Sequence, residues 1–110
     1  MNNDKIHVAR CFDCTNHLWT NNKEYNRVCV KTILDYCYSM LRVRHYLFLN
    51  EVYEHLGMPI TRQGQIAGWV FDKDHEHDDL WTVSTYVDGD DNVYIEFMPS
   101  CDILHVIPEK

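Results

Sequence analysis

A helical period of apolar and polar positions runs through KEYNRVCVKTILDYCYSMLRVRHY, residues 23–46. Apolar residues recur there at steps of three and four, which places them on one face of a helix. The side chain of Asn21 or Asn22 can accept a hydrogen bond from the free amides of a first turn. The pattern therefore predicts a long amphipathic helix that begins after these residues. The expected inner positions are Val30, Ile33, Leu34, Cys37, Met40 or Leu41, and Arg44 or His45, and the expected polar positions are Lys23, Arg27, Lys31 and Asp35.

A second, shorter helix is predicted in LFLNEVYEHLGMP, residues 47–59. Asn50 is the expected N-terminal cap, Gly57 the left-handed residue that ends the helix, and Pro59 prevents its continuation. Thr61 is expected to cap one further turn in TRQGQI. The positions that this helix is expected to bury are Val52, Tyr53 and Leu56.

From Trp69 onward the period changes to two, which is typical of strands. We expect strands in WVF (69–71), at Leu80–Val87, at Asn92–Met98 and at Ile103–Ile107, with DGDD (88–91) as a hairpin turn. Residues 6–19 favour a short strand or extended arm. The alternation places Trp81, Val83 and Val87 on one face of one strand, and Val93, Ile95 and Phe97 on one face of the next. Fold class is thus predicted as α+β, with N-terminal helices packed on a small C-terminal antiparallel sheet.

A chain of 110 residues has room for one domain with one core. Its charge is uneven. Residues 1–66 hold eight basic and six acidic residues, a balance of +2, whereas 67–110 hold two basic and eleven acidic residues, a balance of −9. We expect a mainly helical part (1–66) and an acidic β part (67–110), which together form the single domain 1–110. Such a field repels nucleic acid and favours basic partners.

The acidic residues concentrate in FDKDHEHDD (71–79) and in the hairpin turn. Three interpretations are open for the first segment: a solvated loop, an acidic surface that attracts a partner, or a divalent-ion site. A calcium loop would need a glycine at its sixth position and a glutamate at its twelfth, and both are missing. The candidate binding residues of the acidic patch are Asp72, Asp74, Glu76, Asp78, Asp79, Asp88, Asp90 and Asp91.

Metal ligation has a few candidates but no complete set. Cys11-x-x-Cys14-x-x-His17 offers part of a tetrahedral zinc site, and a structural site needs a second ligand pair, which no second Cys-x-x-Cys supplies. Cys29, Cys37 or the pair His75 and His77 would have to come in through the fold. We therefore expect no cofactor and free thiols, as is usual in a reducing compartment.

Signatures of catalysis and of membrane insertion are missing from the sequence. None of the three serines lies in a G-x-S-x-G elbow, and no glycine-rich phosphate loop occurs. No apolar run approaches the roughly 20 residues of a membrane span, and MNNDKIHVAR lacks a signal-peptide core. We expect a protein that is not an enzyme, does not enter the membrane and resides in the cytosol. Direct nucleic-acid binding is disfavoured by the net charge of −7.

Residues 41–72 read LRVRHYLFLNEVYEHLGMPITRQGQIAGWVFD. This stretch, with FLNEVY, L-G-x-P, a threonine, G-x-I and GW in order, resembles a family of small phage and prophage proteins of unknown function from Firmicutes. VARCFDCTN (8–16) resembles the upstream segment of that family, so the resemblance covers about residues 8–72, with a looser echo at 92–97. It implies an origin in a phage or mobile element and no particular chemistry.

The sequence therefore predicts a non-enzymatic phage or mobile-element protein that acts by binding another protein. Its most concrete form is an inhibitor of a host defence complex, in which the acidic face occupies a basic nucleic-acid channel by phosphate mimicry. Two alternatives are a self-associating phage structural or accessory domain and a zinc-stabilised binding module.

Overall fold

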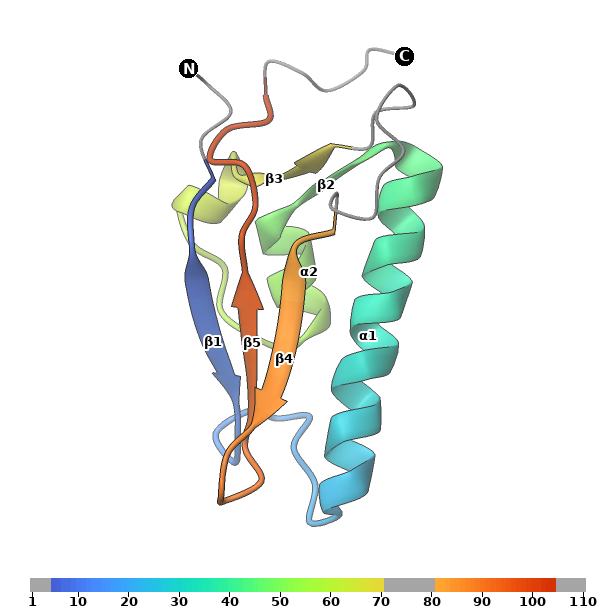
Figure 1. Cartoon of the computed structure of the whole chain (residues 1–110), viewed down its shortest axis with the longest axis vertical. Helices are drawn as coiled ribbons and strands as arrows, with labels where there is room; N and C mark the ends of the chain where they lie inside the picture. The colour runs from blue at the N-terminus through green and yellow to red at the C-terminus, as the bar shows by residue number, and fades with distance from the viewer. Residues whose placement is uncertain (1–4, 71–80, 105–110) are drawn as a thin grey trace.

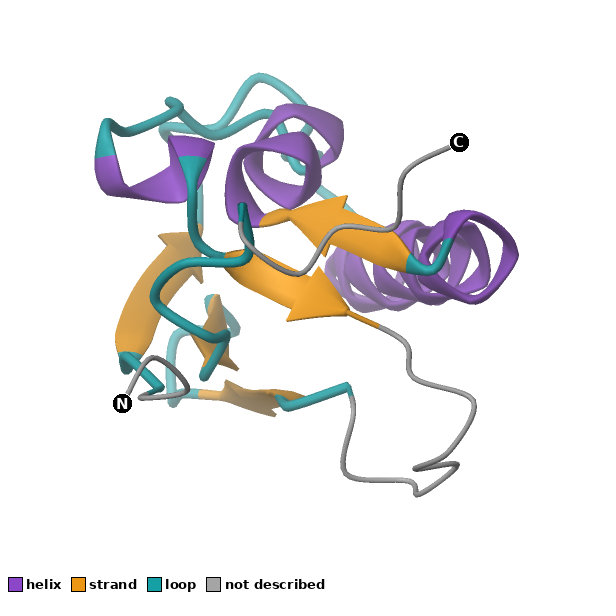
Figure 2. Ribbon diagram, turned by 90° about the horizontal axis from the view of Figure 1, so that it is seen from above, coloured by secondary structure: helices purple, strands orange, loops and turns teal. Residues whose placement is uncertain are grey.

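The computed structural model describes residues 5–70 and 81–104, which form two layers around one core (Figure 1). The three strands β1, β5 and β4 lie on one side, and the helices lie on the other (Figure 2). The elements in chain order are β1 (Val8–Phe12), α1 (Lys23–Arg44), β2 (Tyr46–Phe48), α2 (Leu49–His55), the 3₁₀ turn η1 (Gln63–Gln65), β3 (Gly68–Val70), β4 (Val83–Val87) and β5 (Val93–Phe97).

The predicted α+β class is confirmed, but the sheet is not purely C-terminal. β5 is its central strand and pairs antiparallel with β4 on one edge and with the N-terminal β1 on the other. A separate antiparallel pair, β2–β3, lies near the C-terminal end of α1 (Figure 1). The sequence did not place β1 in the sheet, because strand partners far apart in the chain leave no local signal.

The helix α1 begins and ends as its capping chemistry predicts. Asn22 Oδ1 accepts a hydrogen bond from Tyr25 N (2.9 Å), and His45 adopts the left-handed conformation that closes the helix. No helix in the described part of the chain is long and apolar enough to cross a membrane. The fully buried positions of α1 are Asn26, Val30, Leu34, Cys37 and Leu41, while Ile33 and Met40 are half-buried at the edge of the core.

One expectation for α2 is wrong. The helix begins at Leu49, so Asn50 lies inside its first turn and does not cap it. Glu51 Oε2 accepts from Phe48 N instead, at 3.1 Å. Asn50 fastens the following loop, because its amide donates to Thr61 O and its carbonyl accepts from Thr61 N, each at 2.9 Å. The burial of Val52, Tyr53 and Leu56 and the left-handed Gly57 are confirmed.

The loop after α2 returns the chain to the core. Thr61 Oγ1 accepts from Gly64 N at 2.9 Å and so contacts the turn, but the N-cap residue of η1 is Arg62 and not the expected Thr61. Ile103 is buried and its amide donates to Ile66 O, but Ile103 and Leu104 are not in a strand, and the rest of the predicted last strand lies outside the described residues. Within β5, Val93, Ile95 and Phe97 all face the core, as the alternation predicts.

Candidate protein-interaction surface

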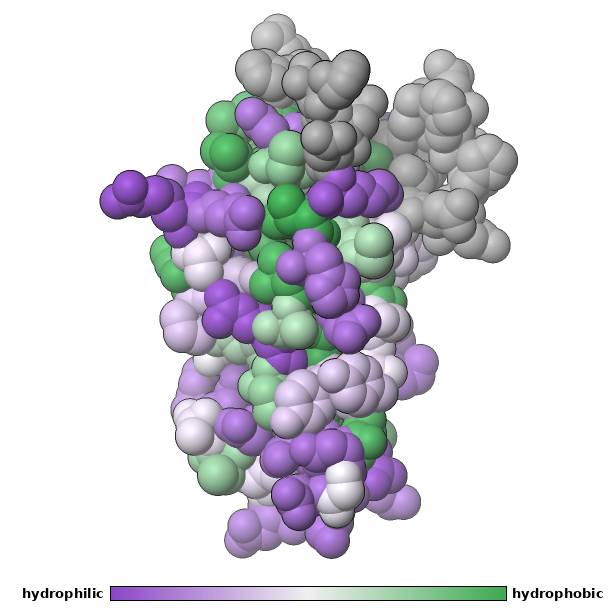
Figure 3. All heavy atoms as spheres, turned by 60° about the vertical axis from the view of Figure 1, so that its left-hand side comes forward, coloured by the Kyte–Doolittle hydropathy of each residue, from purple (hydrophilic) through white to green (hydrophobic). Residues whose placement is uncertain are grey.

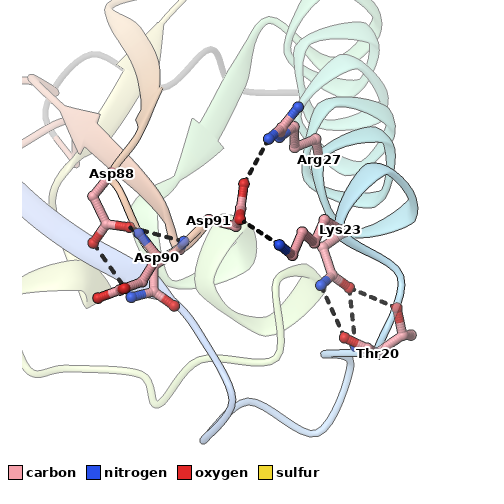
Figure 4. A network of polar contacts seen from close by, with 8 residues as sticks. Thr20, Lys23, Arg27, Asp88, Asp90 and Asp91 are labelled. Atoms are coloured by element: carbon pink, nitrogen blue, oxygen red, sulfur yellow. Dashed lines mark hydrogen bonds and ion pairs between the residues drawn. The ribbon is translucent and has the colours of Figure 1, made fainter.

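The acidic patch predicted from the sequence is described only at the β4–β5 hairpin (Figure 4). Asp88 Oδ1 accepts from the amides of Asp90 and Asn92 and so shapes the turn. Asp91 pairs with two cations of α1, with Lys23 Nζ 3.1 Å from its Oδ2 and Arg27 Nη2 2.7 Å from its Oδ1. We call this arrangement the Asp91 clasp. Of the three patch residues that the structure describes, Asp88 and Asp91 therefore make contacts that support the fold of this chain.

Electrostatics agrees with the geometry of the clasp. Hydrogen bonds from Lys23, then from Arg27, hold the pKa of Asp91 below its ordinary value, so Asp91 stays ionised near neutral pH. Backbone and side-chain hydrogen bonds likewise lower the pKa of Asp88, against a desolvation effect that would raise it. The other predicted patch members, Asp72, Asp74, Glu76, Asp78 and Asp79, lie outside the described residues, as do His75 and His77.

The three described metal candidates do not converge. Cys11 lies in β1, where desolvation raises the pKa of its thiol and the Tyr94 hydroxyl is a hydrogen-bond partner that lowers it. The imidazole of His17 lies against Gly57, and Cys14 is exposed. Within residues 5–70 and 81–104, no three His, Cys, Asp or Glu side chains are grouped so as to hold a metal ion. All five cysteines are free thiols.

A groove of about 420 Å³ lies between α1 and β4, and we call it the α1–β4 groove. Its apolar surface comes from both layers and its rim is charged. β4 lies between β5 and α1 in Figure 1, and α1 runs alongside the strand without covering it. The groove is lined by Arg27, Val30, Lys31, Leu34 and Asp35 of α1 and by Trp81, Val83, Ser84, Thr85, Val87 and Val93.

Beside this groove, one edge of β4 has no strand partner among the described residues. Met98 N donates to Thr82 O and Asp88 N donates to Asn92 O, so in the antiparallel alternation the even-numbered residues of β4 bond to β5. The N–H and C=O groups of Val83, Thr85 and Val87 consequently point away from β5, toward the free edge. Their side chains lie on the face of Val93, Ile95 and Phe97, toward the helix layer.

Two sets of contacts bound the groove at its ends. The Asp91 clasp ties the hairpin to the first turns of α1. At the other end Trp81 packs against Tyr38 of α1, with ring centroids 5.8 Å apart, and against Trp69, at 4.8 Å. Between these ends β4 is exposed at four of its five residues. The groove is thus a preformed slot bounded by α1, the clasp and Trp81.

The sequence did not reveal this surface, because it only grouped Val83 and Val87 on one face of the strand. The structure places that face on the inner side of the sheet and leaves Val87 39% exposed and Val83 half-buried. Alternation identifies the side to which a residue points and says nothing of what covers it. The lysine and arginine residues of the groove rim were predicted correctly as part of the polar face of the helix. That prediction did not indicate a groove beside them.

A second feature is the apolar stripe of α1, which we define as Tyr25, Val28, Tyr36 and Val43, all more than half exposed. Helical spacing places them on one side of α1, away from the groove. Seen from the side of β1, by contrast, apolar side chains form small areas separated by polar ones (Figure 3). The groove and the stripe are therefore two separate surfaces available to a partner.

Comparison with known proteins identifies a family and no function. The model of a family of unknown function (DUF6353) matches residues 1–107. No curated protein and no solved structure matches the chain.

Proposed function

We propose that this chain, which belongs to the DUF6353 family of unknown function, is a non-enzymatic protein that binds a partner protein in the α1–β4 groove. The observation that carries the proposal is the groove itself. It combines apolar surface, charged rim residues and backbone groups of β4 that have no partner among the described residues. That combination suits recognition of a polypeptide, because main-chain groups supply affinity and side-chain contacts supply specificity.

The preformed shape favours binding further. A site whose walls are already in place loses less conformational entropy on association than one that must be ordered. Here the Asp91 clasp and the Trp81 contacts fix the two ends of the slot. The apolar side chains that the partner would cover are Val83, which is half-buried and packs against the core, and Val87, which is 39% exposed.

The origin and target of the protein form the finer part of the proposal. Origin in a phage or mobile element is supported by the resemblance of residues 8–72. Inhibition of a basic host defence complex through the acidic patch is supported by the charge of the C-terminal part. In the described hairpin, however, Asp88 and Asp91 are engaged within the chain, so this form depends on the acidic residues at 72–79. It predicts binding that weakens steeply with salt and is lost when Asp78 and Asp79 are neutralised.

The test uses tagged protein and a lysate of the bacterial host, with bound proteins identified by mass spectrometry. Thr85→Arg fills the groove from an exposed position, and Ala9→Arg places the same side chain at an exposed position of β1 on the outer face of the sheet. We expect a protein that is retained by the wild type and by Ala9→Arg and is lost with Thr85→Arg. Identical retention by all three chains would refute binding at the groove.

Self-association is the second candidate function, and the apolar stripe of α1 favours it. Exposed aromatic and aliphatic side chains along one helix can pair with a second copy of the same helix. The test is light scattering on wild type and Val43→Glu, a position that is 79% exposed in the chain. A dimer that dissociates in the variant supports this function, and a strict monomer at high concentration refutes it.

A further inference from the structure

We propose that the partner presents an extended segment that joins the sheet as a fourth strand on β4, with an acidic side chain facing Lys31 and Arg27. This inference rests on the proposed function and names the conformation and charge of what the groove takes. The occupant is a segment of another protein. A second copy of this chain and a non-extended ligand are outcomes that the test separates.

The backbone of β4 is the first argument. Val83, Thr85 and Val87 each direct one N–H and one C=O away from β5, and within the described residues no backbone hydrogen bond satisfies them. An added strand would pair with all three residues. β4 spans five residues, or about 17 Å of strand, which sets the length of the segment to be recognised.

The sequence of β4 is the second argument. Natural edge strands are protected from pairing by lysine, proline, a bulge or a covering element. VSTYV contains no charged residue and no proline, and its register with β5 is unbroken from Val83 to Val87. An edge that lacks a charged residue, a proline and a bulge is suited to accept a strand.

The position of α1 is the third argument. A strand added at β4 would lie in the groove, so its alternate side chains would point toward the helix. There they meet α1, whose groove-lining side chains are the buried Val30 and Leu34 and the exposed Arg27, Lys31 and Asp35. The helix thus supplies the second wall that makes recognition depend on side chains as well as on main-chain pairing.

Charge selects the kind of segment. The lining holds two cations, Arg27 and Lys31, and one acid, Asp35, in a chain whose net charge is −7. Lys31 lies 3.9 Å from Asp35, and both side chains are largely exposed, so this pair is weak and open to exchange. Arg27 contacts Asp91 through Nη2. An acidic side chain on the inner face of the segment is therefore favoured, and a basic one is disfavoured.

The test is selection from a phage-displayed library of random ten-residue peptides on the full chain. Thr85→Pro removes the outward N–H at the centre of the edge, and Thr85→Ala is the matched control that retains it. Lys31→Glu reverses the charge of the rim. Amide hydrogen exchange on the wild type provides a second measurement that needs no variant.

We expect peptides with alternating apolar residues and at least one inner acidic residue. They should bind Thr85→Ala like the wild type and Thr85→Pro at least tenfold more weakly, and Lys31→Glu should reverse the preference for acid. Bound peptide should slow exchange at the amides of Val83, Thr85 and Val87 at least tenfold, and should slow it less at Ser84 and Tyr86, which already pair with β5.

Three outcomes would overturn the inference. The first is a library that yields no binder. The second is a peptide that binds Thr85→Pro as well as Thr85→Ala and leaves the three amides unprotected. In that case loss of binding in Thr85→Arg would still uphold the groove as the site, so the failure of strand addition is distinguishable from failure of the proposed function. The third is a wild-type dimer that Thr85→Pro alone converts to a monomer, which would make a second copy the occupant.

Discussion

Replacement of Asn26 by alanine should destabilise the fold more than any substitution on the exposed side of α1. Among the described residues, Asn26 is the one buried side chain classed as polar, and it is fully buried. Its Oδ1 accepts from Thr20 N at 2.9 Å and from Thr20 Oγ1 at 2.8 Å, and its Nδ2 donates to Thr20 O at 3.0 Å. These three bonds attach the loop before α1 to the helix (Figure 4).

The magnitude follows from the number of bonds. Each contributes a net stabilisation of about 1 kcal/mol, so alanine should lower the free energy of unfolding by about 3 kcal/mol, with any further loss coming from Thr20 groups left unsatisfied. That is a large part of the 5–15 kcal/mol that is typical of a domain. For a chain of this length the melting midpoint should fall by on the order of 10–20 °C.

The assay is urea and thermal unfolding followed by circular dichroism. Thr32→Ala, an exposed substitution in the same helix, is the control and should change the stability by less than about 0.5 kcal/mol. Thr20→Val removes one of the three bonds, and its effect should shrink in the Asn26→Ala background because the two residues interact. An Asn26→Ala chain within 1 kcal/mol of the wild type would refute the reasoning.

Three further predictions follow from the same contacts. The pKa of Glu51 lies below its ordinary value, because the hydrogen bonds of an arginine and of a backbone amide outweigh the effect of burial. The contribution of Glu51 to stability is therefore present above about pH 4.5 and is lost as the pH falls through the folded pKa. Glu51→Gln should reduce this loss of stability at acid pH when unfolding is measured as a function of pH. Burial raises the pKa of Cys37 to about 12, so at pH 8 a thiol reagent should label the exposed Cys14 quickly and Cys37 only at the rate of unfolding. Gly68→Ala would bring a methyl group within 2.1 Å of a backbone oxygen of β2 and should cost about 1–3 kcal/mol or more in urea unfolding, whereas Gly89→Ala, with nothing within 4 Å, should be tolerated.

The helical half of the fold could be predicted because its signals are local. A cap at Asn22, apolar steps through Val30 and Leu34, and a glycine at position 57 each act within one or two turns of chain. Asn26 lies on the same helical face as Val30 and Leu34, so its spacing is consistent with burial. A search for apolar residues does not identify it, because its side chain is polar. The pairing of β1 with β5 joins residues more than 80 positions apart, and no local pattern encodes such a contact.

The candidate site was harder to predict, because it depends on an edge of β4 that has no neighbouring strand among the described residues. The sequence drew attention to the acidic residues, and in the described hairpin these mainly complete the turn and the Asp91 clasp. The alternation in β4 correctly grouped Val83 and Val87 on one face, which the structure places toward the helix layer. The groove beside this face depends on where α1 lies relative to β4. That position depends on contacts between distant parts of the chain, at both ends of the groove, and not on a local pattern.

The contacts at the two ends of the groove connect α1 to the β4 side of the sheet, and between these contacts β4 remains exposed. The Asp91 clasp and the packing of Trp81 on Tyr38 and Trp69 lie at the two ends of the groove. Between them Val83 stays half-buried and Val87 stays 39% exposed, so part of their apolar surface is not buried by folding. The proposed extended segment would bury this apolar surface and would pair with the backbone of Val83, Thr85 and Val87, which have no such partner within residues 5–70 and 81–104.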